Sequence, residues 1–276
     1  MVDQTSAPKE LYDWQKEKQP FQFGRVMNRA FAGLFKNIKY ILGAILIVCL
    51  ISVFLSLPTL LADADNVTST TAPVLILASV LSLISFFFFF MFIAVFTDHV
   101  AFTSFTNRKI NFKRLFFRSL KLTLPVLFVG ILYFLASNIG MIFLIVPGVI
   151  MSVGWCVIGP AYLHEDTPLL GSFGRSWQLT RGYKWWVWLS NIVMGIIILI
   201  IFSISALIVS AMSLGQVTTS EMSVGFSTTS FLGGLLFSLL IYLAIALYAS
   251  FTTALYTELR ELKEGPLAEE MSAVFD

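Results

Sequence analysis

The chain has 276 residues, of which 57% are hydrophobic and only 12% are charged, and its formal net charge is +2. A soluble domain of average composition carries about 25% charged residues, so this composition excludes an ordinary water-soluble fold. It points instead to a protein that spans a membrane several times.

The first 39 residues are mostly polar and contain many basic side chains. A signal peptide has a short basic region followed by a brief apolar one, so this segment does not fit that pattern. Apolar residues recur within it at helical spacing, and basic or amide side chains occupy much of the remaining helix surface. The apolar set is Phe23, Met27, Phe31, Leu34, Phe35 and Ile38. We expect an amphipathic helix that lies in the membrane interface.

Six apolar runs follow this segment, at 40–61, 73–97, 122–146, 149–163, 185–212 and 231–255. A helix needs roughly 20 residues to cross ~30 Å of hydrocarbon, so only the fourth run is short. We count it as a span, because without it the basic segment 164–184 would lie outside. The predicted fold is an all-α membrane protein with six transmembrane helices arranged as three hairpins.

All Lys and Arg residues lie in four polar segments, 1–39, 98–121, 164–184 and 256–276. The other connections, 62–72, 147–148 and 213–230, contain none. The positive-inside rule therefore places both termini in the cytoplasm. The resulting organisation is a cytoplasmic N-terminal segment (1–39), a six-helix transmembrane domain (40–255) and a cytoplasmic C-terminal tail (256–276).

The third and fourth apolar runs are joined by Pro147 and Gly148 without a polar loop. The chain must reverse there within a few residues, and glycine adopts a positive φ at little steric cost. We therefore predict a tight structural turn at Pro147 and Gly148.

A short internal repeat precedes the hairpins. The sequence of 118–123, Arg-Ser-Leu-Lys-Leu-Thr, recurs at 175–180 as Arg-Ser-Trp-Gln-Leu-Thr, and 29–34 is a weaker copy. Each copy comes just before a pair of apolar runs. The predicted unit is thus one cytoplasmic amphipathic helix followed by one transmembrane hairpin, and the chain contains three such units.

Arg29, Arg118 and Arg175 occupy the same position in the three copies, and Arg181 follows the third. A guanidinium can bind a phosphate through two parallel hydrogen bonds, so these four arginines are candidate contacts for anionic lipid headgroups. The alternative is that they serve only as topological anchors, which requires charge and no particular geometry.

Residues typical of catalysis are few. The only histidines, His99 and His164, lie next to carboxylates at the ends of predicted spans, and neither has the spacing of a zinc site or a serine triad. We expect these clusters to be solvated ends of helices. We predict no enzymatic activity, no metal and no cofactor.

The six apolar cores contain no Asp, Glu, Lys, Arg or His, whereas coupled transporters usually keep such groups in their spans. The sequence therefore favours a non-enzymatic scaffold or a lipid-related envelope protein. The alternative is a transporter or channel for an apolar or lipid-like substrate. We expect membrane lipids as partners and no nucleic acid, and the sequence identifies no protein partner.

One bacterial family shares several of these features. The stretch 144–150 with its Pro-Gly pair, then Trp155 and Pro160, then 171–182 with its Ser-Trp-Gln-Leu-Thr-Arg-Gly helix, resembles the glycerophosphoryl diester phosphodiesterase membrane domain. The opening 21–26 and the closing 256–260 also resemble that family. The resemblance implies a stand-alone module of the bacterial inner membrane. Nothing in the chain matches the catalytic barrel that gives the family its name.

Overall fold

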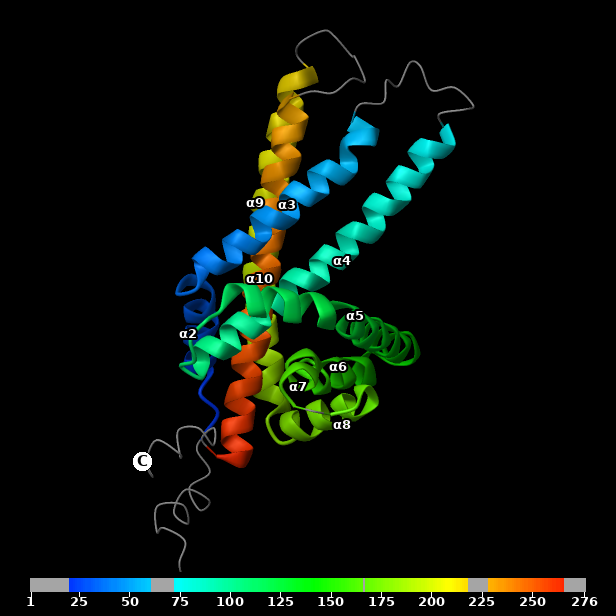
Figure 1. Ribbon diagram of the computed structural model, residues 1–276. Helices are drawn as coiled ribbons and strands as arrows, with labels where there is room; N and C mark the ends of the chain where they lie inside the picture. The colour runs from blue at the N-terminus through cyan, green and yellow to red at the C-terminus, as the bar shows by residue number, and fades with distance from the viewer. Residues whose placement is uncertain (1–19, 61–71, 166, 218–227, 266–276) are drawn as a thin grey trace, which may run out of the picture.

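The computed structural model describes residues 20–60, 72–165, 167–217 and 228–265, and these residues form helices without any strand (Figure 1). The helices are α2 (Phe23–Phe35), α3 (Ile38–Leu60), α4 (Ala72–Phe105), α5 (Phe112–Phe143), α6 (Ile145–Gly154), α7 (Ile158–His164), α8 (Leu169–Thr180), α9 (Lys184–Val217) and α10 (Thr228–Glu264). The predicted all-α class is confirmed.

Six stretches of these residues are long and apolar enough to cross a membrane: Ile38–Leu55, Leu75–Phe105, Phe112–Ile142, Val146–His164, Lys184–Ala211 and Leu232–Glu264. Many of their large apolar side chains face outward, among them Leu50, Leu83 and Leu199. Such exposure is costly in water and favourable in lipid, so the structure is compatible with a multi-pass membrane protein.

The described parts of the four basic segments gather at one end of the molecule. In Figure 1, α2, the end of α4, the start of α5, α7, α8 and the end of α10 lie in the lower half of the molecule. From there α3, α4, α9 and α10 extend toward the opposite end, and contacts join α3 to α4 and α9 to α10.

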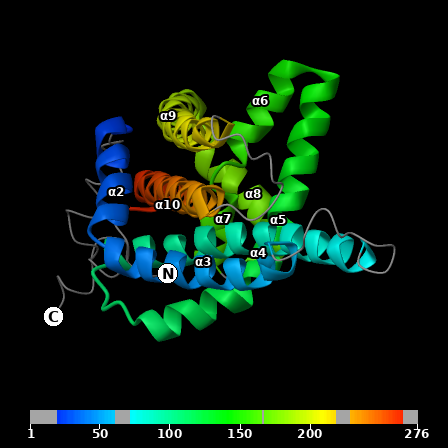
Figure 2. The same cartoon turned by 90° about the horizontal axis from the view of Figure 1, so that it is seen from above.

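The second half of α5 and helix α6 pack side by side, and this pair runs across the direction of α9 (Figures 1 and 2). Helix α5 is one element from Phe112 to Phe143, with Pro125 inside it. The sequence had predicted a separate amphipathic helix before the third span. The structure instead joins the two parts, and a proline inside a helix removes one backbone hydrogen bond and favours a bend.

The chain reverses at Leu144, which has extended backbone angles of φ −159° and ψ 125°. Pro147 and Gly148 lie inside α6, and Gly148 is not among the described glycines with positive φ, which are Gly182 and Gly265. The predicted turn at Pro147 and Gly148 is therefore wrong in place and in backbone conformation. Pro147 is tolerated because the first turn of a helix leaves backbone N–H groups unpaired anyway.

Gly148 is needed for a different reason. A Cβ atom there would come within 2.6 Å of the backbone nitrogen of Met141 in α5. Helices α5 and α6 can approach this closely only because Gly148 lacks a side chain, as small residues permit in membrane helix pairs.

The fourth apolar run is divided into α6 and α7, with Gly154 as the last residue of α6. The hydroxyl groups of Ser176 and Thr180 in α8 donate to the Gly154 carbonyl at 2.9 and 3.2 Å. A Cβ atom at Gly154 would lie 2.3 Å from the Trp177 ring. The third copy of the repeat is thus a docking site for the end of α6.

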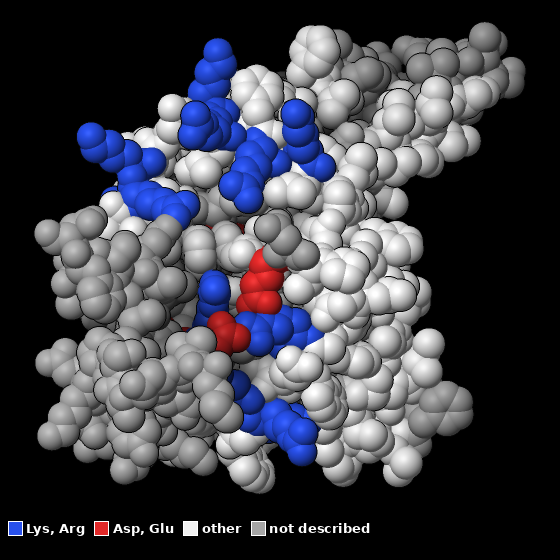
Figure 3. All heavy atoms as spheres, turned by 60° about the horizontal axis from the view of Figure 1, so that its bottom comes forward, with Lys and Arg blue, Asp and Glu red and all other residues white. Residues whose placement is uncertain are grey.

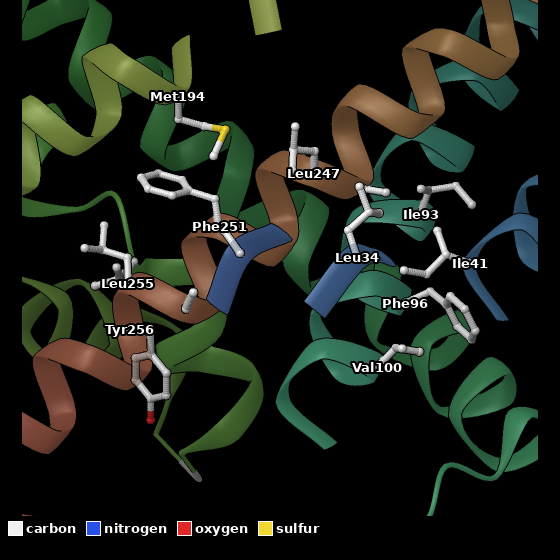
Figure 4. Packing of buried hydrophobic residues seen from close by; sticks show 14 of the residues in the cluster. Leu34, Ile41, Ile93, Phe96, Val100, Met194, Leu247, Phe251, Leu255 and Tyr256 are labelled. Atoms are coloured by element: carbon white, nitrogen blue, oxygen red, sulfur yellow. The ribbon is translucent and has the colours of Figure 1, made fainter. Parts of the chain in front are cut away.

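The buried apolar core lies near the end where the basic segments gather. Figure 4 shows side chains of α2, α3 and α4 meeting on one side of α10, and Met194 of α9 meeting Phe251 on the other. Helix α10 continues past residue 255 to Glu264, with Tyr256 and Leu259 buried. The predicted boundary between transmembrane domain and tail therefore falls inside this helix, because the segment after 255 packs into the fold.

Candidate functional site

Asp98 and His164 form a buried pair between α4 and α7. His164 Nε2 lies 2.6 Å from Asp98 Oδ2, and each side chain is 5% exposed. The Thr253 hydroxyl of α10 donates to the other carboxylate oxygen, and the Phe102 ring stacks on His164 with centroids 3.7 Å apart. The expectation of solvated histidine clusters is wrong here, because α10 packs over the ends of α4 and α7.

His99 lies beside this pair. Its ring centroid is 5.7 Å from that of His164, and its Nδ1 is 2.9 Å from the Val95 carbonyl and 3.3 Å from the Ser119 hydroxyl. The Nε2 atom of His99 is buried without a hydrogen-bond partner in the described part of the chain. Ser119 is the second residue of the repeat's middle copy, as Ser176 is of the third, and both side chains are buried.

These groups do not have the geometry of a catalytic triad. In a triad the histidine stands between hydroxyl and carboxylate, whereas Thr253 and His164 both contact Asp98. Among the described residues, no three His, Cys, Asp or Glu side chains are arranged to hold a metal ion. The arrangement is suited to joining α4, α7 and α10.

A second polar network joins α7, α8 and α10. Arg175 Nε lies 2.5 Å from Glu165 Oε2, and the same guanidinium contacts Glu264. The Tyr256 hydroxyl donates to Glu165 Oε1 at 2.8 Å, and Arg260 lies 3.1 Å from Glu264. Partial burial alone would lower the pKa of Arg175, but its hydrogen bonds to Glu165 and Glu264 outweigh that effect and raise it.

Ion pairs also attach α2 to α10. Arg29 Nη1 lies 2.9 Å from Glu261 and 3.5 Å from Glu258, and Arg25 Nε lies 3.4 Å from Glu258. The Glu258 side chain is only 1% exposed. Arg29 and Arg175 are thus directed at carboxylates of this chain, a pairing that the sequence analysis missed. The signal was Glu258, Glu261 and Glu264, which recur every three residues after the last apolar run.

The other two candidate headgroup contacts, Arg118 and Arg181, are exposed. Arg118 lines an open groove of about 710 Å³ on the first turns of α5. We call this feature the basic groove; its residues are Asn111, Lys113, Arg114, Phe117, Arg118, Lys121 and Leu122. Figure 3 shows this end of the molecule, with one group of basic side chains near the top of the view and another that surrounds acidic side chains.

Comparisons with models of protein families, with curated proteins and with solved structures found no match to this chain. The resemblance to the glycerophosphoryl diester phosphodiesterase membrane domain therefore stays a prediction, and the functional argument depends on geometry and charge.

Proposed function

We propose that this chain is a non-enzymatic integral protein of the bacterial inner membrane, with both termini in the cytoplasm, that acts as a scaffold for anionic lipids. Two features support the proposal. The outer surfaces of the long helices are apolar, and the basic residues gather at the end that the positive-inside rule assigns to the cytoplasm.

The observation that best supports the proposal is that every described carboxylate already has a partner within the chain. The described carboxylates are Asp98, Glu165, Glu258, Glu261 and Glu264. Each of them already contacts a cationic or histidine side chain of this chain. They hold helices together at the end of the bundle. Exposed cations that remain on this end can interact with anionic lipid, and each contributes on the order of 1 kcal/mol near such a surface.

The test compares the lipids that stay with the purified protein to those of the membrane it came from. Native mass spectrometry after extraction in mild detergent should show phosphatidylglycerol or cardiolipin enriched over phosphatidylethanolamine. An unenriched lipid composition would overturn the proposal.

A second readout separates a scaffold from a lipid transporter. The protein is reconstituted into vesicles that contain a fluorescent lipid, and an impermeant reductant bleaches the lipid of the outer leaflet. If the protein is a scaffold, the bleached fraction should equal that of protein-free vesicles. Bleaching of both leaflets would overturn the scaffold and support transport of a lipid-like substrate.

A further inference from the structure

The basic groove differs in its charge from the other basic sites of the repeat. Arg29 and Arg175 each contact two carboxylates, whereas none of the ion pairs of the described residues involves Lys113, Arg114, Arg118 or Lys121. The carboxylates that the structure describes all have other partners. No carboxylate among the described residues is therefore paired with Arg118, and its guanidinium is open to an anion from outside this part of the chain.

The spacing of the groove residues concentrates charge on one face of α5. Arg114, Arg118 and Lys121 lie at i, i+4 and i+7, which places them on adjacent turns of one side of the helix. Like charges at this spacing repel each other, so the bare groove is electrostatically unfavourable. A bound anion removes that repulsion, and two guanidinium groups one turn apart can each donate paired hydrogen bonds to phosphate oxygens.

An apolar surface continues directly from the groove. Phe117, Leu124 and Phe128 lie at i, i+7 and i+11, close to the face of Arg114 and Lys121. Their exposed fractions are 53%, 62% and 54%. This part of α5 belongs to a stretch apolar enough to enter a membrane. The same helix face therefore presents cations first and then an apolar surface. This order matches the charged headgroup and the acyl chains of an anionic lipid.

We propose that the basic groove binds the phosphate headgroup of an anionic membrane lipid, with the acyl chains lying along Phe117, Leu124 and Phe128. This inference rests on the proposed function and gives it a site. It assigns headgroup binding to Lys113, Arg114, Arg118 and Lys121. Arg29 and Arg175 instead join helices within the fold.

The experiment titrates the detergent-solubilised full chain with phosphatidylglycerol and measures binding by native mass spectrometry. The test variant is Arg118→Gln with Lys121→Gln. The matched control is Lys36→Gln with Lys39→Gln, which removes the same charge at the same spacing from exposed positions near α2 and α3. All four side chains are exposed, so both variants should fold like the wild type, which circular dichroism checks.

The groove variant should bind phosphatidylglycerol about 25-fold more weakly, since each basic residue near an anionic surface contributes roughly a fivefold factor. The control should change binding less than threefold. Equal weakening in both variants would overturn the groove assignment and leave the proposed function standing. Absence of binding by the wild type would overturn both.

A competition arm identifies the source of the phosphate. Water-soluble glycerol phosphate has the headgroup chemistry without acyl chains, and it should not displace the lipid at concentrations a hundredfold higher. Displacement at equal concentration would overturn the lipid assignment in favour of a free phosphate ligand. In the same titration, Leu124→Gln should weaken lipid binding, and unchanged affinity would contradict the acyl path along α5.

Discussion

Asp98 is the buried carboxylate of the pair that joins α4 to α7, and its two oxygens have different partners. A buried carboxylate–histidine pair is a weak source of stability in itself, because desolvation of both groups offsets their attraction. Removal of only one partner is much more damaging, since the remaining charge stays buried without compensation.

The first prediction follows from this asymmetry. His164→Phe keeps a ring beside Phe102 but leaves Asp98 without its partner, and it should lower the free energy of unfolding by about 3 kcal/mol. Adding Asp98→Asn removes the stranded charge, so the double variant should be more stable than His164→Phe alone. Thermal unfolding in detergent, followed by circular dichroism, measures both. Strictly additive losses would show that the two residues do not interact.

The buried histidines also show which features could not be predicted from the sequence. Hydropathy and the positions of Lys and Arg were sufficient for an all-helical chain with six apolar helices, because both depend on local composition. The burial of the Asp98–His164 pair depends on α10, whose Thr253 lies 155 residues after Asp98. Local spacing contains no information about such a distant covering helix, so the prediction of solvated clusters failed.

At the scale of elements, α10 takes part in most of the polar contacts between helices that are described above. Its Glu258 and Glu261 face Arg25 and Arg29 of α2, and its Glu264 faces Arg175 of α8. Glu258 and Glu261 are three residues apart and therefore lie on one face of α10. Glu264 is six residues after Glu258 and is directed toward a different helix. The end of α10 therefore holds α2 and α8 through separate carboxylates.

The second prediction tests that separation. Glu258→Gln weakens the attachment of α2, so hydrogen exchange should accelerate in 23–35 and remain unchanged in 169–180. Glu264→Gln should produce the opposite pattern. Each variant serves as the control for the other, and hydrogen–deuterium exchange with mass spectrometry resolves the two segments. Acceleration in both segments for either variant would mean that the end of α10 acts as one cooperative unit.

At the same scale, the arginines of the predicted repeat have different surroundings in the structure. The buried serines explain part of the pattern: Ser119 contacts His99, and Ser176 contacts the end of α6. Which arginine would find a carboxylate depended on the position of α10. The sequence analysis could therefore not separate Arg118 from Arg29 and Arg175.

At the scale of the whole molecule, the link between α5 and α6 bears on the topology. Helix α6 has 10 residues and spans about 15 Å at 1.5 Å per residue. Its end at Gly154 is fixed to α8, at the end of the molecule where the basic segments gather. Because the pair of α5 and α6 also runs across the direction of α9, Leu144 reaches at most about half of a ~30 Å hydrocarbon layer. Helices α5 and α6 can therefore form a re-entrant pair that enters and leaves the membrane on the cytoplasmic side. Both this arrangement and two full crossings place 164–184 on the cytoplasmic side.

The last prediction separates these two arrangements by cysteine labelling in intact cells, in a background with Cys49→Ala and Cys156→Ala. Leu144→Cys should react poorly with an impermeant thiol reagent, because a side chain in the cytoplasmic half of the hydrocarbon layer is not reached by a charged reagent from outside. Leu144 is 66% exposed in the structure, so low reactivity would reflect lipid and not burial in protein. Ser69→Cys and Ser220→Cys, predicted on exterior connections and outside the described residues, are the positive controls. Labelling of Leu144→Cys as fast as these controls would restore an exterior turn and two full crossings by 122–163.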